Sequence, residues 1–350
     1  MKRPTIADIA LRAGVTKAAV SFALNGQPGV SAATRERILA IAEEIGFQPS
    51  VAARALTAGK AEAFGLVIDR PARTLGIEPF FMQLISGIQA ELAAHQVTLL
   101  FTMTEDTDAE IDLYRRWWAQ RRVDGVIVVD LQVDDRRIAA IEKLRMPAVV
   151  LGTPRGTGTL PAVWQDDRAA VDLVVGYLAG LGHRRIARVG GLGGYWHSVL
   201  RRDAFAAAAE AAGLAAFSVE ADYTAEHGAE ATAGLLGSAE PPTAILYDND
   251  VMAAAGLGVA QRMGISVPDG VSIVAWDDSA LCELMHPALT ALRRDIAGAG
   301  ATAARILRQL ADGGHPEHVE EEKPVLQVRA SSGPAGVPAL PVAEWTGRTA

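Results

Sequence analysis

The 350-residue sequence contains a single cysteine, Cys282, and only 5% of its residues are aromatic. One cysteine excludes an intrachain disulfide and a cysteine-built metal site, and it fits a reducing compartment. No apolar run approaches the length of a membrane-spanning helix, and the first residues contain no signal-peptide core. We therefore expect a soluble, cytoplasmic protein of two or three domains without a membrane partner, in which Cys282 is a buried apolar residue.

Charge is distributed unevenly along the chain. The net charge is −8 at pH 7. Residues 1–60 carry eight Lys or Arg against four Asp or Glu, whereas the remainder carries 25 against 37. A basic N-terminal segment on an acidic body is expected when one small domain contacts phosphates. The charge pattern therefore favours a nucleic-acid contact in the first 60 residues.

Helix caps and stops predict two short helices at the start of the chain. Thr5 can cap the first helix, which ends at Gly14. Thr16 can cap a second helix that runs from Lys17 to about Leu24. The tight glycine-containing corner between them is typical of a helix-turn-helix.

A third helix is predicted after Ser31, which can serve as its cap. Apolar residues at helical spacing predict its buried face. These residues are Ile38, Leu39, Ala42 and Ile45. A compact three-helix domain follows from this pattern.

The second helix is the candidate DNA-reading element, because the first residues of such a helix enter the major groove. Lys17 can donate to guanine or phosphate, whereas Ala18 and Phe22 can contact thymine methyl groups. The residues that we predict to contact DNA in this domain are Thr5, Thr16, Lys17, Ala18, Ser21, Phe22, Asn25, Ser31 and Thr34. A three-helix bundle with a solvated face is the alternative, since helix-turn-helix spacing is only moderately specific.

The segment 49–61 predicts a helix of about two turns, which is too short to be stable alone in water. A segment of this kind suits folding on contact with a partner, and a plain linker is the alternative. A ligand that changes subunit geometry could melt such a hinge and release DNA.

From residue 64 onward, short apolar β-rich runs alternate with helical stretches. The runs cover residues 64–68, 97–102, 124–129, 148–151, 185–190, 243–247 and 271–276. Nearly continuous apolar strands separated by helices indicate parallel sheets covered on both faces. The repeated alternation predicts two doubly wound sheets. The segment 331–350 is rich in Pro, Gly and Ala and is predicted to be disordered.

Residues 4–60 closely resemble the headpiece of the lac repressor (LacI-type) family, and the resemblance continues to about Arg329. The motifs are Pro-Thr-Ile-Ala-Asp-Ile-Ala at 4–10, Val-Ser-x-x-Thr-Arg at 30–35 and Gly-Phe-x-Pro at 46–49. The resemblance implies a hinge that becomes helical over the operator's minor groove, with Leu56 wedged between base pairs. Family members commonly carry Arg at the position of Phe22, so the base pair read there is left open.

The resemblance also implies the architecture. An all-α helix-turn-helix headpiece (1–48) and a hinge (49–61) precede an effector-binding and dimerisation domain (62–330). That domain is an α/β core of two doubly wound parallel-sheet subdomains, like a periplasmic binding protein. We place the first subdomain at about 62–161 and 293–320, the second at about 162–292 and 321–330, and the disordered tail at 331–350.

Ligands of open α/β sheets bind outside the carboxyl ends of the strands. Arg201, Asn249 and Asp277 match ligand-binding positions of the family, and Glu78–Phe81 matches a segment on the other side of the cleft. The effector-binding residues that we predict are Phe80, Trp164, His197, Arg201, Asn249, Trp276 and Asp277. Carboxylates, one arginine and tryptophans able to stack on a ring favour a sugar over a purine, although many strand-end polar groups merely cap helices.

The sequence also bears on two other protein classes. An enzyme is disfavoured because residues 190–194 fail the Gly-x-Gly-x-x-Gly register, with Trp196 at the third glycine. Neither a phosphate loop, a nucleophile elbow nor a zinc motif occurs, so we expect no cofactor and no metal. A transport-binding protein shares the fold but would need a signal peptide and would lack the headpiece.

The sequence thus predicts a homodimeric regulator that binds a pseudo-palindromic operator in double-stranded DNA. We expect a repressor of carbohydrate genes under allosteric control by a small sugar-like effector. The tail from Pro334 is broken by Pro and Gly, so a tetramer built on a leucine heptad is not expected.

Overall fold

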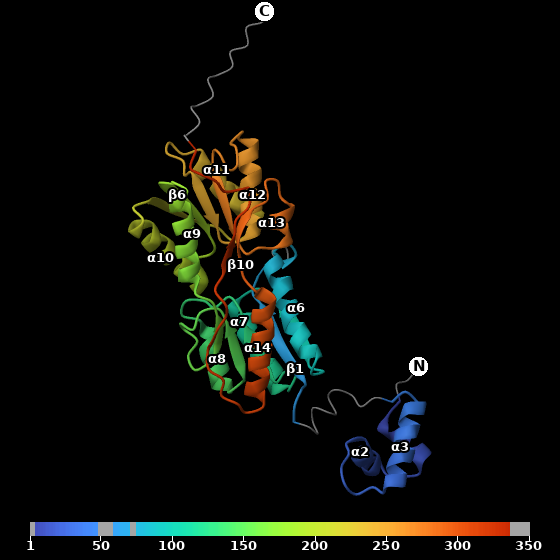
Figure 1. Cartoon of the computed structure of the whole chain (residues 1–350). Coiled ribbons are helices and arrows are strands. Elements are labelled where there is room, and N and C mark those ends of the chain that lie inside the picture. The colour runs from blue at the N-terminus through green and yellow to red at the C-terminus, as the bar shows by residue number, and fades with distance from the viewer. Residues whose placement is uncertain (1–3, 48–58, 71–74, 337–350) are drawn as a thin grey trace, which may run out of the picture. The chain divides into compact units, whose positions relative to one another are not determined.

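The computed structural model describes residues 4–47, 59–70 and 75–336. The chain divides into two compact units, Met1–Ala61 and Glu62–Ala350, each of which has its own core (Figure 1). Most of the predicted hinge, Leu56 included, lies outside the described residues. Among the residues described, no helix is long and apolar enough to cross a membrane.

The N-terminal unit contains the three predicted helices. They are α1 (Ile6–Ala13), α2 (Lys17–Leu24) and α3 (Ala32–Glu44). One fully buried residue from each helix, Ile9, Val20 and Ile38, forms the centre of a small core. The prediction that Leu39 is buried is wrong, because its side chain is 45% exposed, one helical step off the face that holds Ile38 and Ala42.

The corner between α1 and α2 depends on Gly14. This residue caps the C-terminus of α1 in the left-handed conformation, with φ of 64°. Glycine adopts that conformation without the steric cost that a Cβ imposes. Thr16 then begins α2 two residues later, so the predicted turn is confirmed.

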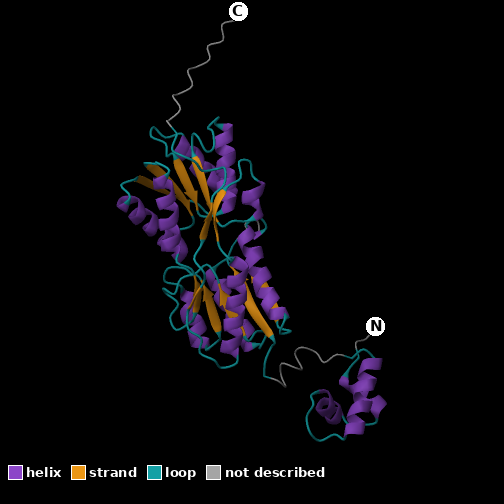
Figure 2. Cartoon of the chain, viewed as in Figure 1, coloured by secondary structure: helices purple, strands orange, loops and turns teal. Residues whose placement is uncertain are grey.

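The larger unit contains two parallel sheets, each with helices on both faces (Figure 2). The first lobe has the strand order β11-β5-β4-β3-β1-β2. Its strands are β1 (Ala63–Ile68), β2 (Thr98–Met103), β3 (Gly125–Val128), β4 (Ala148–Leu151), β5 (Ala162–Trp164) and β11 (Val319–Glu320). Its helices are α6 (Pro79–Ala93), α7 (Thr107–Ala119), α8 (Arg136–Leu144) and α14 (Ile296–Ala311).

The second lobe repeats this plan with the order β12-β10-β9-β8-β6-β7, in which only the pairing of β12 with β10 is antiparallel. Its strands are β6 (Arg185–Gly190), β7 (Ala215–Glu220), β8 (Ala244–Tyr247), β9 (Ser272–Trp276), β10 (Thr290–Arg293) and β12 (Val325–Gln327). Its helices are α9 (Asp167–Gly180), α10 (Trp196–Ala211), α11 (Ala225–Leu236), α12 (Asp250–Arg262) and α13 (Ala280–Leu284). Cys282 on α13 is buried, as expected.

The chain passes between the lobes after β5, after β10 and after β11 in the described core. The predicted boundary at residue 161 is therefore a few residues early, because β5 belongs to the first lobe. Its residues Ala162 and Val163 pair with Val150 and Leu151 of β4. A three-residue strand is too short to show a hydrophobic pattern of its own.

The predicted disordered tail does not begin at residue 331. Ser331 is fully buried and Ser332 nearly so. The Ser331 hydroxyl accepts from the backbone N–H of Thr290 at 2.8 Å and donates to the carbonyl of Ile273 at 2.6 Å. Composition alone predicted disorder, whereas the Ser331 hydroxyl satisfies backbone groups of β9 and β10. Residues 337–350 lie outside the described part.

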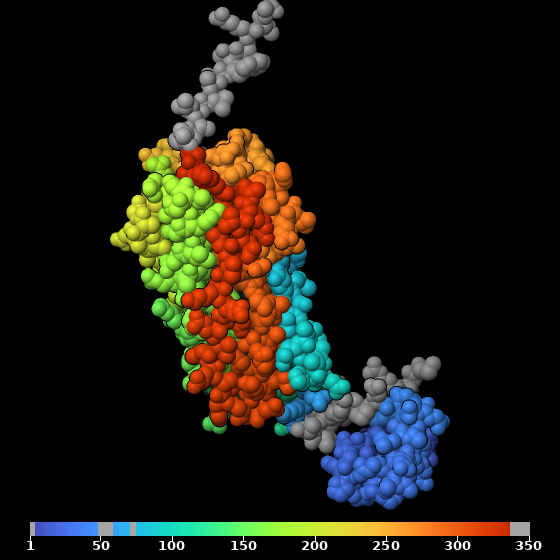
Figure 3. All heavy atoms as spheres, viewed as in Figure 1, coloured from blue at the N-terminus to red at the C-terminus, as the bar shows by residue number. Residues whose placement is uncertain are grey.

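Helices α6 and α14 pack directly against each other on the first lobe (Figure 3). Gly87 of α6 makes this approach possible, since a Cβ built there would lie 1.8 Å from the carbonyl oxygen of Ala297. The pairing matters for the site because Glu78 precedes α6 and Arg294 precedes α14. Both residues line the pocket between the lobes.

Candidate functional sites

The N-terminal end of α2 presents an open surface. Lys17 and Ala18 are exposed, and the Phe22 side chain is 41% exposed although it is apolar. Thr16 caps the helix by accepting from the backbone N–H of Ala19 at 3.1 Å. Ser21 is half-buried, and its hydroxyl accepts from Asn25 at 3.3 Å. The structure thus places the predicted reading residues together on one helix.

The remaining predicted DNA contacts lie at the other helix ends. Thr5 donates from its backbone N–H and its hydroxyl to the Asp8 carboxylate, at 2.8 and 2.6 Å. Ser31 accepts from the backbone N–H of Thr34 at 3.3 Å, and its hydroxyl donates to the Thr34 hydroxyl at 2.9 Å. These groups cap their helices in the free chain. If these residues contact DNA phosphates, their hydroxyls are already held in position by the helix caps.

A second candidate site is a pocket between the lobes of the larger unit, at the carboxyl ends of the strands. Five of the seven predicted effector residues line it, from both lobes. They are Phe80, Trp164, His197, Arg201 and Asp277. The location agrees with the general position of ligands in open α/β sheets.

The other two predicted residues, Asn249 and Trp276, do not line the pocket. Asn249 caps α12 by accepting from the backbone N–H of Met252 at 2.8 Å, and its amide donates to the carbonyl of Tyr223 at 3.0 Å. Trp276 is fully buried beneath Arg201. The helix-cap alternative therefore applies to Asn249, and Trp276 supports the pocket from below.

Three arginines line the pocket, and each pairs with a carboxylate that also lines it. The pairs are Arg70 with Asp130 at 2.8 Å, Arg201 with Asp167 at 3.1 Å and Arg294 with Asp277 at 2.6 Å. Five of the six residues follow strand ends or begin a helix, and Arg201 lies in the second turn of α10. The pocket is consequently polar, but the charge of each arginine is balanced by a neighbouring carboxylate.

Sequence reasoning missed Arg70, which lies two residues after the end of β1 and is only 6% exposed. Its guanidinium carbon lies 4.8 Å from the ring centroid of Tyr195 and 4.5 Å from that of Tyr223. These cation–π contacts, a longer one to Phe81 at 5.9 Å and one ion pair fix the guanidinium in the cleft. The sequence signal that could have identified Arg70 is its position just after the end of a strand.

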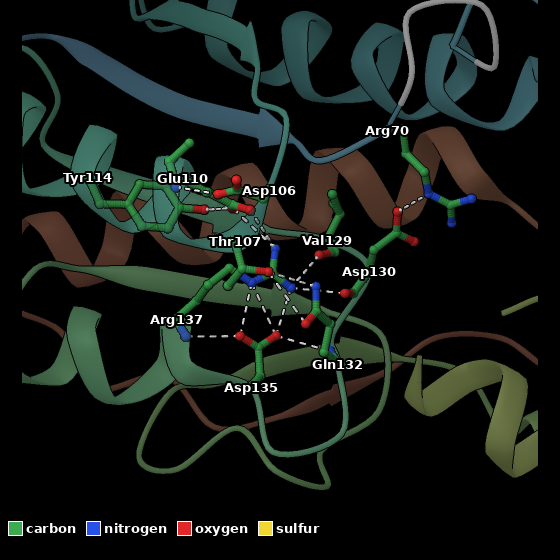
Figure 4. Close-up of polar contacts among 11 residues, drawn as sticks. Arg70, Asp106, Thr107, Glu110, Tyr114, Val129, Asp130, Gln132, Asp135 and Arg137 are labelled. Atoms are coloured by element: carbon green, nitrogen blue, oxygen red, sulfur yellow. Dashed lines mark hydrogen bonds and ion pairs between the residues drawn. The ribbon is translucent and has the colours of Figure 1, made fainter. Parts of the chain in front are cut away.

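Asp130 is held by a buried network centred on Arg137 of α8 (Figure 4). The Arg137 guanidinium donates to the carbonyls of Val129 and Asp130, at 3.1 and 2.9 Å, and to Glu110 of α7 at 3.0 Å. Asp130 itself adopts a left-handed backbone, with φ of 51°. Burial acts to raise the pKa of Asp130, but the charge and hydrogen bond of Arg70 lower it overall.

Glu78 is a further pocket residue that the prediction left out, although Glu78–Phe81 was noted as a cleft segment. Only 7% of the residue is exposed, and burial raises its pKa to about 7. Its Oε1 accepts from the Asn249 amide of the other lobe at 3.5 Å. Within the described residues, its Oε2 has no hydrogen-bond partner.

His197 of α10 is neutral in this pocket. Burial and, after it, the charge of Arg201 lower its pKa to about 3. Its Nε2 lies 2.6 Å from the Tyr223 hydroxyl, which also lies 2.8 Å from the hydroxyl of Ser198. A neutral imidazole in a hydrogen-bonded chain suits recognition of a polar ligand.

The pocket combines fixed hydrogen-bonding groups with the aromatic residues Phe80 and Trp164. This combination is typical of a small-molecule binding site. A search of the described residues finds no group of three or more His, Cys, Asp or Glu side chains arranged to hold a metal ion. The arrangement therefore favours reversible binding of a polar molecule.

Comparison with known families gives two matches. Residues 5–50 match the model of bacterial regulatory proteins of the lacI family. Residues 175–332 match the periplasmic binding protein-like domain. The first match covers the helix-turn-helix unit, and the second covers most of the second lobe.

Similar proteins align over nearly the whole chain. The transcriptional regulator MalR of Streptomyces coelicolor is 32% identical over 343 residues, which cover 94% of this chain and 97% of that protein. The lac repressor dimer bound to operator and the anti-inducer ONPF has a TM-score of 0.83 and 25% identity, with 95% and 100% covered. The complex of the regulator CelR with cellobiose has a TM-score of 0.72 and 27% identity, with 94% and 100% covered.

Proposed function

The chain belongs to the lacI family of bacterial regulatory proteins, and we propose that it represses carbohydrate genes under the control of a sugar bound between its lobes. As a member it is a DNA-binding transcriptional regulator and not an enzyme. The α2 face with Lys17, Ala18 and Phe22 reads the operator, one half-site for each headpiece. Because its DNA target is chromosomal, we place the protein in the cytoplasm.

The observation that carries the effector proposal is the lined pocket between the lobes. Hydrogen-bonding side chains from both lobes, among them Arg201 and Asp277, meet there beside the aromatic residues Phe80 and Trp164. A sugar offers hydroxyls for the polar groups and an apolar ring face for Trp164. The related CelR forms a complex with cellobiose, which supports the same ligand class here.

Effector binding controls DNA affinity if the ligand favours one arrangement of the two lobes over another. The pocket already contains contacts across the cleft, such as the Glu78–Asn249 hydrogen bond and the stacking of Arg70 on Tyr223. A ligand that replaces these contacts shifts the balance between lobe arrangements. The difference in ligand-binding free energy between the two lobe arrangements can then change the spacing of two headpieces.

We infer that the chain acts as a homodimer, because one half-site offers too little contact for specific affinity. Apolar side chains are exposed on both lobes, with Ile77 and Met82 60% exposed and Leu284 82% exposed. Such side chains are suited to an interface between two copies. Sedimentation velocity at micromolar concentration should give a dimer, and a stable tetramer would contradict this point.

The test of the proposed function is operator affinity. Fluorescence anisotropy with DNA selected from genomic fragments, at fixed salt, is measured with and without mono- and disaccharides. A change of tenfold or more with one sugar, equal to about 1.4 kcal/mol of coupling, supports the proposal. Specific DNA binding that no sugar changes would assign the pocket to another ligand class. A lack of specific DNA binding would contradict the regulatory role itself.

A further inference from the structure

Two polar atoms in the cleft are buried without a partner. Among the described residues, neither Arg70 Nη1 nor Glu78 Oε2 makes a hydrogen bond. Both residues line the pocket, and both are more than nine-tenths buried. Native structures rarely leave buried polar groups unsatisfied, because each such group has given up its water. An unmet donor and an unmet acceptor in one pocket indicate a ligand that supplies both.

The donor is held rigidly. The Nε of Arg70 donates to Asp130, and the guanidinium carbon lies 4.8 and 4.5 Å from the ring centroids of Tyr195 and Tyr223. Arg137 in turn fixes the Asp130 backbone through its carbonyl. Arg70 therefore cannot turn Nη1 toward another protein group without losing an ion pair and two ring contacts. A rigid donor of this kind loses little entropy when a ligand binds.

The acceptor is held from the opposite lobe. Glu78 Oε1 accepts from the Asn249 amide, which leaves Oε2 as the free oxygen. Glu78 and Arg70 interact through their charges, but the described structure records no hydrogen bond between them. A ligand that reaches both residues therefore meets an acceptor at Glu78 and a donor at Arg70.

Seven acidic residues but only three arginines line the pocket in the described part of the chain, so its charge balance disfavours an anion. Arg201 and Arg294 each have a carboxylate partner in the pocket, as does Arg70. Glu78 adds a carboxylate that has no such partner among the described residues. A phosphate or carboxylate on the ligand would meet this surplus negative charge. An uncharged ligand meets no such repulsion.

The aromatic side chains favour hydroxyls over a flat heterocycle. The Arg201 guanidinium already covers Trp276, and the Arg294 guanidinium carbon lies 5.8 Å from the ring centroid of Phe80. A purine carries a donor next to an acceptor, as two neighbouring sugar hydroxyls do. Unlike a sugar, however, a purine binds by stacking on the open face of an aromatic side chain. Two of the aromatic faces near the cleft are thus already used by arginines.

We propose that Arg70 and Glu78 form a subsite for two neighbouring hydroxyls of an uncharged sugar. One hydroxyl donates to Glu78 Oε2, and the adjacent hydroxyl accepts from Arg70 Nη1. This inference rests on the proposed function, in which the cleft binds a sugar, and it names the residues that select the sugar. Since both residues also contact the second lobe, occupancy of the subsite changes contacts across the cleft.

The experiment is calorimetric titration of the full chain with glucose, maltose, cellobiose, glucose 6-phosphate and guanine. The sugar that binds best is then compared with its singly deoxygenated versions. The variants are Glu78→Gln and Arg70→Met, and Glu91→Gln is the matched control on the same helix, where Glu91 pairs with Arg308 away from the pocket. Urea unfolding shows whether each variant is folded.

We expect a neutral sugar to bind and Glu78→Gln to weaken it tenfold or more, while Glu91→Gln has no effect. The deoxygenated sugar that lacks the hydroxyl recognised by Glu78 should bind the wild type and Glu78→Gln with equal affinity. The deoxygenated sugar that lacks the adjacent hydroxyl should bind the wild type and Arg70→Met with equal affinity. If Arg70→Met does not fold, the Glu78→Gln comparison decides.

Three results would overturn the inference. These are tightest binding of glucose 6-phosphate or guanine, no binding of any neutral sugar, and equal sugar affinity in the wild type and Glu78→Gln. The proposed function fails separately, when no sugar changes operator affinity in the anisotropy measurement. A sugar that shifts operator affinity equally in the wild type and Glu78→Gln leaves the proposed function standing and removes this subsite.

Discussion

The guanidinium carbon of Arg201 lies 4.0 Å from the ring centroid of Trp276, and its Nε donates to Asp167 at 3.1 Å. The tryptophan is fully buried, so it forms the surface on which Arg201 rests. The charge of Arg201 is balanced by Asp167 while its remaining N–H groups can serve a ligand in the pocket. A cation–π contact thereby links the hydrophobic core of the second lobe to the binding site.

Replacing Arg201 by alanine should abolish the effector response and leave DNA binding in the absence of effector intact. The change removes a donor from the pocket and leaves Asp167 unpaired, whereas the headpiece is a separate unit. Fluorescence anisotropy with and without the active sugar measures both properties. Arg202→Ala is the matched control, because Arg202 is exposed and pairs with Asp203. A wild-type response in Arg201→Ala would show that this arginine does not contact the effector.

The headpiece and most core strands could be predicted from sequence because their signals are local. The caps Thr16 and Ser31 and the stop at Gly14 each act within a few residues. The edge strand β7 was missed because its side chains are largely exposed and its apolar character is weak, as Phe217 at 46% exposure illustrates. Edge position is a tertiary property that no local pattern records.

The site was only partly predicted. Family motifs predict Arg201 and Asp277, whereas no motif marks Arg70 and Asp130, which follow strand ends of the first lobe in the same way. Whether a strand-end side chain turns into the cleft or back onto a helix depends on its neighbours. Asn249 caps α12 and stays out of the pocket, although its sequence position resembles that of a ligand-binding residue.

The contribution of Glu78 to the free energy of unfolding should fall as pH rises from about 4.5 to about 7. Burial raises the pKa of Glu78 from 4.5 to about 7, so the folded state holds its proton more tightly than the unfolded state. Its contribution is complete below pH 4.5 and is lost as pH rises through 7, on the order of 3 kcal/mol. Glu78→Gln should remove this slope, measured by urea unfolding at several pH values.

The pH comparison needs the variant because His197 acts in the opposite direction. Its pKa is lowered to about 3, so its contribution is present above pH 6.5 and is lost as pH falls. The difference between wild type and Glu78→Gln cancels this effect, as well as that of Asp250, whose pKa burial raises to about 6. Parallel stability curves for the two proteins would refute the assignment of a raised pKa to Glu78.

Removing the Phe22 ring should weaken operator binding and relax sequence preference at one base pair of each half-site. The ring is exposed at the α2 surface and can contact a thymine methyl group, and a mismatch at one base pair of a site typically costs roughly 1–3 kcal/mol. Anisotropy on a set of single-base operator variants measures both effects for Phe22→Ala. Leu11→Ala is the control, since Leu11 is an 85% exposed apolar residue on α1. Uniform weakening across all operator variants would mean that Phe22 does not read a base.

Gly87→Ala should destabilise the core and weaken effector binding together. The new Cβ would lie 1.8 Å from the Ala297 carbonyl oxygen, and a backbone group of this kind cannot move without moving α14. Overpacking of this kind costs about 1–3 kcal/mol, which urea unfolding detects. Separating α6 from α14 also separates Glu78 from Arg294, which precede these helices and line the pocket.

The matched control for Gly87→Ala is Ser86→Ala, because Ser86 is the preceding residue on α6 and is exposed. It adds no atoms between the helices, so its unfolding midpoint and its sugar affinity should equal those of the wild type. Lost stability with unchanged sugar affinity in Gly87→Ala would mean that the helix pair supports the fold without setting the width of the pocket. Loss of both would show that the close approach of α6 and α14 positions residues on one wall of the effector site.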